Sequence, residues 1–189
     1  IEGLHTETGP GVYEAAIAFS GALESADRAI LFKTGAKEIG KRFGVMPSFM
    51  AKWNQALPGC SGHIHQSLSD GSKNVFFDAK HKHGMSKLFE SYLAGQVACL
   101  MEFAPMFWPT INSYKRFEDM SWAPTRIAWS RDNRTAGFRV VGHGPSLRIE
   151  CRIPGADANP YIAYAAGIAA GLEGIRERIE PGDMFEGDI

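Results

Sequence analysis

The chain has 189 residues, 44% hydrophobic and 22% charged, so it can bury a core and does not have the composition of a disordered or fibrous protein. Its 20 basic and 21 acidic residues nearly cancel, which argues against a nucleic-acid-binding or membrane-surface protein. No apolar run approaches the roughly 18 residues that span a bilayer, and no signal-peptide pattern opens the chain. We therefore expect one cytoplasmic domain over residues 1–189, with neither nucleic acid nor membrane as partner.

The cysteines and the chain ends add two expectations. Cys60, Cys99 and Cys151 are an odd number without CxxC spacing, which argues against a disulfide framework and a thiolate zinc site. The sequence opens without methionine and closes on a polar tail rich in glycine and aspartate. We therefore expect the chain to be a portion of a longer protein.

The first 19 residues contain two glutamates, Glu7 and Glu14, on either side of a Gly-Pro-Gly interruption at 9–11. Seven positions apart, they would face opposite sides of an unbroken strand, but glycine and proline can reset that alternation. The two carboxylates then point into one site. The alternative is a pair of surface glutamates that flank a turn.

Residues 25–43 predict a helix with Ser25 as N-cap and Gly44 as the stop. Residues 45–53 are a strand candidate. The expected inner stripe of the helix is Ala29, Ile30, Ala36, Ile39 and Phe43.

Residues 59–68 alternate polar and apolar side chains, so a strand here places His63, His65 and Ser67 on one face. Two imidazoles and a hydroxyl suit a metal or a phosphate group. A satisfied structural pair of histidines is an equal alternative.

Three further segments precede the arginine-rich region. Residues 74–77 predict a short hairpin strand, and the second HxH pair at 81–83 lies among lysines that favour solvated surface. Residues 86–104 have the wide apolar face of a buried helix. Residues 106–126 contain two prolines and Arg116, and predict an irregular loop of the kind that carries function.

Three arginines, Arg131, Arg134 and Arg139, fall within nine residues. Guanidiniums this close repel one another unless an anion such as a polyphosphate or a carboxylate lies among them. Surface arginines paired with acids elsewhere are the alternative.

Residues 147–153 predict a strand with Arg148, Glu150 and Arg152 on one face and apolar side chains on the other. An Asn-Pro pair then starts a helix over 160–179 whose small residues allow close helix packing. Carboxylates with an imidazole suit Mg²⁺ or Mn²⁺, and a set of arginines suits phosphates and a carboxylate substrate. A metal-assisted phosphoryl-transfer site follows as a hypothesis.

The sequence resembles the glutamine synthetase family from Glu7 to Ile175, and among its members it is most similar to γ-glutamyl-amine synthetases and lengsin-like proteins. Each block alone is a weak signal, but their common order is specific. The blocks are ETGPGVYE (7–14), FMAKW followed by GCSGHIHQSL (49–68), NSYKRF (112–117), RDNRTAGFRV (131–140) and RIECRIPGADANPYIAYAAGIAAGLEGI (148–175).

The resemblance implies a role for each matching position. The divalent metal ligands would be Glu7, Glu14, His63 and Glu150. The nucleotide and phosphate contacts would be His65, Ser67, Arg134, Arg139 and Arg148, with Arg134 and Arg139 stabilising the transferring phosphoryl group. The glutamate-binding positions would be Arg116, Arg152 and Gly59.

The implied reaction is ATP-dependent formation of a γ-glutamyl amide from glutamate and an amine or ammonia through γ-glutamyl phosphate, with Mg²⁺ or Mn²⁺. Hairpin-like and helical connections between the expected strands indicate an α+β fold, and the resemblance implies a curved and largely antiparallel sheet with helices packed outside. The expected strands are 8–18, 45–53, 62–68, 74–77, 136–141 and 147–153.

Three departures from the family pattern matter. Trp122 stands where glutamine synthetases carry a glutamate that binds ammonium and takes its proton, and an indole cannot act as that base. Pro58 replaces an asparagine near the glutamate pocket, and Gly62 replaces the usual residue before the metal histidine. The β-grasp domain that precedes the catalytic domain in the family is absent from this chain.

This third departure implies that the fragment alone is inactive, because the family's sites form between subunits of a dodecamer-type homo-oligomer. The leading hypothesis is a carbon-nitrogen ligase that uses an amine. Glutamine synthesis with ammonia and a non-catalytic, lengsin-like structural or binding protein are the alternatives.

Overall fold

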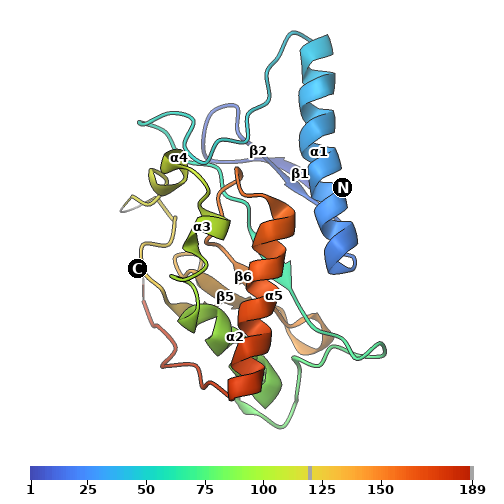
Figure 1. The fold of residues 1–189 in the computed structure, drawn as a ribbon, viewed down its shortest axis with the longest axis vertical. Helices are drawn as coiled ribbons and strands as arrows, with labels where there is room; N and C mark the ends of the chain where they lie inside the picture. Colours follow the sequence, from blue (N-terminus) through green and yellow to red (C-terminus); the bar gives the residue numbers. More distant parts are fainter. Residues whose placement is uncertain (119–120, 188–189) are drawn as a thin grey trace.

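The computed structural model describes residues 1–118 and 121–187 as an α+β fold, shown in Figure 1. Its strands and helices come in mixed order along the chain. In sequence order they are β1 Gly3–Thr6, β2 Tyr13–Ala16, α1 Ala22–Arg42, β3 Ile64–Gln66, the 3₁₀ helix η1 Lys82–Gly84, α2 Lys87–Ala98, α3 Ala104–Phe107, α4 Ile111–Tyr114, β4 Trp129–Arg131, β5 Phe138–Val141, the 3₁₀ helix η2 Gly144–Ser146, β6 Arg148–Cys151 and α5 Pro160–Glu177.

A four-stranded sheet in the order β3-β6-β5-β4 carries the central segment 148–151 as one of its two inner strands. β6 pairs antiparallel with both neighbours, whereas β4 and β5 run parallel, so the sheet is mixed. Across these ladders Glu150 lies opposite His65 on one side and Arg139 on the other. The register alone therefore groups a carboxylate, an imidazole and a guanidinium.

The core lies between this sheet and the helices α2 and α5, which lie in front of it in Figure 1. Leu147, Ile149 and Cys151 are buried in the core, so the predicted alternation of this segment is confirmed. β6 therefore turns its apolar face to the helices and its charged row to the opposite side.

α2 and α5 approach closely through glycine. A Cβ on Gly95 would lie 2.1 Å from the carbonyl oxygen of Ala170, and one on Gly174 would lie 2.1 Å from that of Ser91. Asn159 caps α5 by accepting a hydrogen bond from Tyr161 N–H at 3.0 Å. The prediction of a helix that starts at Asn-Pro and packs tightly through small residues is confirmed.

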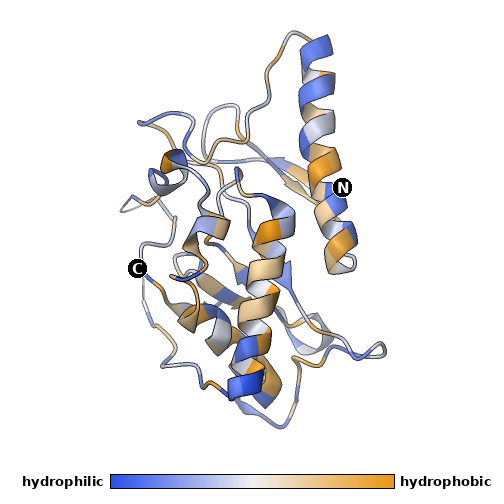
Figure 2. Cartoon of the chain, viewed as in Figure 1, coloured by the Kyte–Doolittle hydropathy of each residue, from blue (hydrophilic) through white to orange (hydrophobic). Residues whose placement is uncertain are grey.

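α1 lies at the edge of the molecule and packs against α5. The helix was predicted, but it begins at Ala22 after Gly21 rather than at a Ser25 cap, because Ser25 Oγ bonds to Ser20 instead. Ile39 and Phe43 are 57% and 78% exposed, so their placement on an inner stripe was wrong. The residues that α1 buries are small, Ala26, Ala29 and Gly40, which lets it lie close to its neighbours. Figure 2 shows hydrophobic residues along this peripheral helix.

Two predicted strands do not form. Residues 45–53 are irregular because the Asn112 side chain takes the place of a partner strand: its Oδ1 accepts from Lys52 N–H at 3.0 Å and its amide donates to Lys52 O at 2.7 Å. Residues 74–77 form only isolated bridges, at Asn74 and at Phe77. Of the predicted strand 8–18, only Tyr13–Ala16 forms a strand, β2, because residues 9–12 make a turn. The antiparallel partner of β2 is β1, Gly3–Thr6, which was not predicted.

The predicted irregular loop 106–126 contains the end of α3 and the single-turn helix α4, and its positions 119 and 120 lie outside the described residues. The predicted helix 86–104 ends at Ala98 and continues after a turn as α3. Within the described ranges, none of the helices has the length and hydrophobicity needed to cross a membrane.

Candidate functional site

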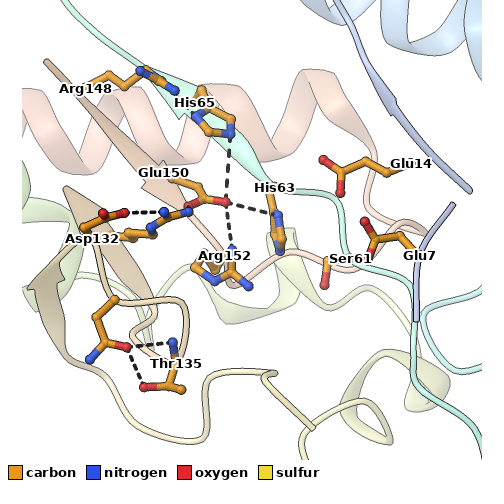
Figure 3. A network of polar contacts seen from close by, with 12 residues as sticks. Glu7, Glu14, Ser61, His63, His65, Asp132, Thr135, Arg148, Glu150 and Arg152 are labelled. Atoms are coloured by element: carbon orange, nitrogen blue, oxygen red, sulfur yellow. Dashed lines mark hydrogen bonds and ion pairs between the residues drawn. The ribbon is translucent and has the colours of Figure 1, made fainter. Parts of the chain in front are cut away.

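Glu150 lies at the centre of a polar network on the charged face of the sheet (Figure 3). Its Oε1 accepts a hydrogen bond from Arg152 at 2.8 Å and lies 3.2 Å from His63 Nδ1. Its Oε2 accepts a hydrogen bond from Arg139 at 3.0 Å. This buried carboxylate therefore faces two guanidiniums and an imidazole.

These neighbours keep Glu150 ionised. Burial by itself would raise the pKa of this carboxyl, but the hydrogen bond from His63 and the charges of Arg152 and His63 overcome burial and hold the pKa well below its usual range. Burial would also lower the pKa of Arg139, but its hydrogen bonds to Asp132 and Glu150 raise that pKa above its ordinary value. Negative and positive side chains therefore alternate along the network, in the order Asp132, Arg139, Glu150 and Arg152.

His65 lies across the ladder from Glu150 on β3. Burial, together with the guanidiniums of Arg148 and Arg139, lowers the pKa of His65 to about 4 although Glu150 opposes this. The ring is therefore neutral at pH 7, and its Nδ1 accepts a hydrogen bond from Arg148 Nε at 3.1 Å. That bond leaves the proton on Nε2, which lies 3.9 Å from Glu150. Ser67 follows β3 on the exposed surface.

The hairpin β1–β2 carries a second group of potential ligands. His5 pairs with Glu14 across the hairpin, and its Nε2 lies 3.1 Å from Glu7 and 3.6 Å from Glu14. One ligand atom from each of the three residues lies within 4.8 Å of the others. The two glutamates therefore do converge, and the turn at 9–11 is what brings them together.

Sequence reasoning missed His5, although its position two residues before Glu7, which directly follows β1, was a usable signal. In Figure 3 the carboxylates of Glu7 and Glu14 are directed toward the side of the site that holds His63 and Ser61. Among the residues that the structure describes, however, His63 and Glu150 belong to no such three-ligand group with them.

Arg116 is 2% exposed and reaches the end of β6 from the loop after α4. Its guanidinium donates to Ser61 Oγ at 2.9 Å and to the backbone carbonyls of Arg152 and Ile153. Gly59 allows this position, because a Cβ there would lie 2.7 Å from Arg116 Cγ. Ser61 is a contact that sequence reasoning missed.

The three clustered arginines separate in the structure. Arg139 joins Glu150, whereas Arg131 donates to His83 O at 2.7 Å and Arg134 is exposed on the turn before β5. Asp132, another residue missed from sequence, forms an ion pair with Arg139 (Figure 3). A short turn between parallel strands splits the cluster.

Two of the positions that differ from the family pattern, Gly62 and Trp122, have distinctive surroundings or backbone conformations in the structure. A Cβ on Gly62 would lie 2.7 Å from Gly155 O, so the glycine permits close approach of the turn after β6. Trp122 is 61% exposed and has a φ of 59°, a left-handed conformation that is rare for a bulky residue. No structural reason distinguishes Pro58.

Comparison with known proteins shows the family of this chain. A family model described as glutamine synthetase, catalytic domain, matches residues 1–189. The chain belongs to this family. A type-1 glutamine synthetase 2 of Dictyostelium discoideum is 56% identical over 182 residues, which cover 95% of this chain and 35% of that protein.

The names of two other relatives of this chain refer to organic amines as substrates. The γ-glutamylethanolamide synthetase GlnA4 of Streptomyces coelicolor is 46% identical over all of this chain and 41% of its own length. The glutamate–isopropylamine ligase of a Pseudomonas species is 42% identical over the same shares of the two chains. A solved structure described as a GmaS/ADP complex superposes with a TM-score of 0.91 at 31% identity, over 98% of this chain and 44% of that one. The chain thus spans about two fifths of the length of these relatives.

Proposed function

We propose that the protein containing this chain is an ATP-dependent carbon-nitrogen ligase that forms a γ-glutamyl amide from glutamate and an amine or ammonia. The observation that carries the proposal is the Glu150 network, a buried carboxylate held between Arg139, Arg152 and His63. Family membership and the names of the relatives support the same reaction. Residues 1–189 form one domain of it.

An imidazole and three carboxylates are donor types that suit a divalent metal such as Mg²⁺ or Mn²⁺. His63 Nδ1 and Glu150 Oε1 present a nitrogen and an oxygen 3.2 Å apart, while Glu7 and Glu14 present carboxylates from the hairpin. When bound, the metal supplies neutralisation of charge between phosphate and carboxylate. Replacing Glu150 by alanine should weaken Mn²⁺ binding measured by calorimetry, and an unchanged affinity would remove Glu150 from the metal ligands.

The remaining polar residues are assigned to the two anionic substrates. Arg139 and Arg134 stabilise the phosphoryl group as the glutamate γ-carboxylate oxygen bonds to the terminal phosphorus of ATP and ADP leaves. The nucleotide is bound by His65, Ser67 and Arg148. Glutamate is held by Arg116 and Arg152 near Gly59. The amine nitrogen then bonds to the acyl carbon, the bond from that carbon to the phosphate oxygen breaks, and the nitrogen passes its proton to the released phosphate.

An organic amine is the proposed nitrogen donor. Trp122 offers a π face and one N–H donor, so it can attract an alkylammonium but cannot take its proton. Its exposure leaves the indole free to contact such a substrate. We also propose that the full-length protein is cytoplasmic and a dodecamer-type homo-oligomer.

The deciding experiment measures ADP release by the full-length protein with glutamate and, in turn, ammonia, methylamine, ethanolamine and a polyamine. We expect release with an organic amine. Release with ammonia alone would refute the amine assignment. ATP binding without turnover on any of them would favour a structural or binding protein of the same fold.

A further inference from the structure

The turn between β6 and α5 carries a carboxylate, Asp157, that the proposed chemistry does not use. Its Oδ2 accepts hydrogen bonds from Ser113 Oγ at 2.6 Å and from Thr110 Oγ1 at 3.2 Å. Its Oδ1 is buried and has no hydrogen-bond partner among the described residues. A Cβ on Gly155 would lie 2.4 Å from this oxygen, so glycine makes room for the carboxylate to fold back on its own turn.

The two hydroxyls that Asp157 binds belong to the capping box of α4. Thr110 Oγ1 accepts from Ser113 N–H at 3.3 Å, and Ser113 Oγ accepts from Thr110 N–H at 3.1 Å. Ser113 is fully buried. Asp157 therefore ties the first turn of α4 to the turn after β6.

Arg116 lies one helical turn after Ser113, whose carbonyl accepts its N–H at 3.4 Å. The guanidinium of Arg116 donates to the carbonyls of Arg152 and Ile153, at the start of the same turn that ends in Asp157. Residues 110–116 thus contact the turn at two places, at its start and at Asp157. Lys33 of α1 fixes the turn from the other side, since its Nζ donates to Ala158 O at 2.9 Å.

The charges follow the same arrangement. Burial and the neighbouring charge of Arg152 lower the pKa of Arg116 to about 10, and Asp157 is the leading charge that opposes them. Burial likewise lowers the pKa of Arg152, and Glu150 is the leading charge that opposes this shift. Each of the two adjacent buried guanidiniums therefore has one carboxylate to offset its charge.

We infer that Asp157 is a positioning residue, which fixes α4 against the β6–α5 turn and thereby sets the guanidinium of Arg116 for the substrate carboxylate. The inference rests on the proposed function, in which Arg116 binds glutamate. A displacement of about 1 Å at such a group is enough to weaken substrate binding and turnover strongly.

The test uses the full-length enzyme and the variants Asp157→Ala, Ser113→Ala and their double. We expect each single variant to raise the KM for glutamate about tenfold while the KM for ATP stays within about twofold. The double variant should be no worse than Asp157→Ala, because both remove the same link. Asp78→Ala is the matched control, a turn aspartate that accepts from Lys80 N–H at 3.0 Å and should change neither constant.

Hydrogen exchange provides a readout that does not depend on turnover. Asp157→Ala should reduce protection of residues 110–116, whereas Asp78→Ala should not. If the wild-type enzyme shows no activity, the proposed function fails but this measurement still tests the positioning role. Equal changes in both KM values, additive effects in the double variant, or a loss of thermal stability with an unchanged KM for glutamate would each overturn the inference.

Discussion

Glu150 shows how a single residue links the fold to the proposed chemistry. It is 4% exposed, and its position on an inner strand places Arg139 and His65 directly across two ladders. Burial of an ion is costly unless its partners are equally well placed. The same contacts that would present the carboxylate to a metal therefore also stabilise the sheet.

Replacing Glu150 by glutamine should reduce the free energy of unfolding by about 3 kcal/mol, because it leaves the buried guanidinium of Arg152 without its counter-charge and removes one of the two carboxylates that pair with Arg139. Urea denaturation of the metal-free protein measures this. Glu173→Gln is the control, since Glu173 pairs with Arg176 on the exposed end of α5 and its loss should cost less than about 1 kcal/mol. Equal effects of the two substitutions would contradict the role given to the network.

The stabilisation by Glu150 should depend on pH in a defined direction. Its folded-state pKa is lower than the ordinary value of 4.5, so the unfolded chain binds more protons as the pH falls. The contribution is fully present above about pH 4.5 and is lost progressively below it. In EDTA, the stability difference between wild type and Glu150→Gln should therefore shrink from pH 6 to pH 3, and a constant difference would rule out this linkage.

Trp122 should decide the nitrogen donor. Trp122→Glu introduces a carboxylate that can bind ammonium and accept its proton, and general-base catalysis commonly contributes about 100-fold or more. We expect the ratio of kcat/KM for ammonia to that for an amine to rise about 100-fold in the full-length enzyme. Trp122→Gln separates charge from shape, and an equal gain with glutamine would show that a base is not the cause.

At the scale of elements, the sequence predicted best where pattern and capping agree. β6 and α5 are as expected because alternation sets the two faces of the strand and an Asn-Pro pair starts the helix. The segment 45–53 failed because its backbone partner is the Asn112 side chain, more than fifty residues away. Such a contact has no local signal.

The α2–α5 contact makes a sharp prediction. Gly95→Ala should destabilise the fold by about 3 kcal/mol, because the new methyl group would press against the Ala170 carbonyl and force the helices apart. Gly35→Ala on α1 meets nothing within 4 Å and should stabilise by up to about 1 kcal/mol through helix propensity. Thermal unfolding distinguishes them, and similar shifts for both would show that the helices can relax apart.

On the scale of the whole molecule, the predicted site residues fall into groups that only tertiary structure could define. Sequence spacing suggested one anion among the three clustered arginines, yet only Arg139 of the three contacts Glu150 among the described residues. The partners Ser61 and Asp132 were missed because they contribute through distance and orientation rather than through a motif. The order of the elements thus predicts the fold class, whereas the contacts within the site are known only from the three-dimensional structure.

The exposed apolar residues of α1 and of its C-cap, Phe43, predict how the isolated chain behaves in solution. Leu31 and Phe43 are 71% and 78% exposed, which favours self-association and binding of hydrophobic dyes. Leu31→Lys combined with Phe43→Lys should lower the fluorescence of 8-anilinonaphthalene-1-sulfonate with residues 1–189, without loss of helical circular dichroism. Glu38→Lys on the same helix should leave it unchanged, and no difference between the two variants would locate the dye elsewhere.

The parallel pairing of β4 and β5 has a consequence for the order of folding. Parallel strands usually meet only after a long crossover, but here paired residues such as Ser130 and Arg139 are nine positions apart. Closing so short a loop costs little entropy, so this pair is as local as a hairpin. β6 follows β5 directly in the chain and pairs with it next. The pairing of β3 with β6 joins residues more than eighty positions apart, so it forms last. Arg139 is therefore expected to be in place before the imidazole of His65 arrives.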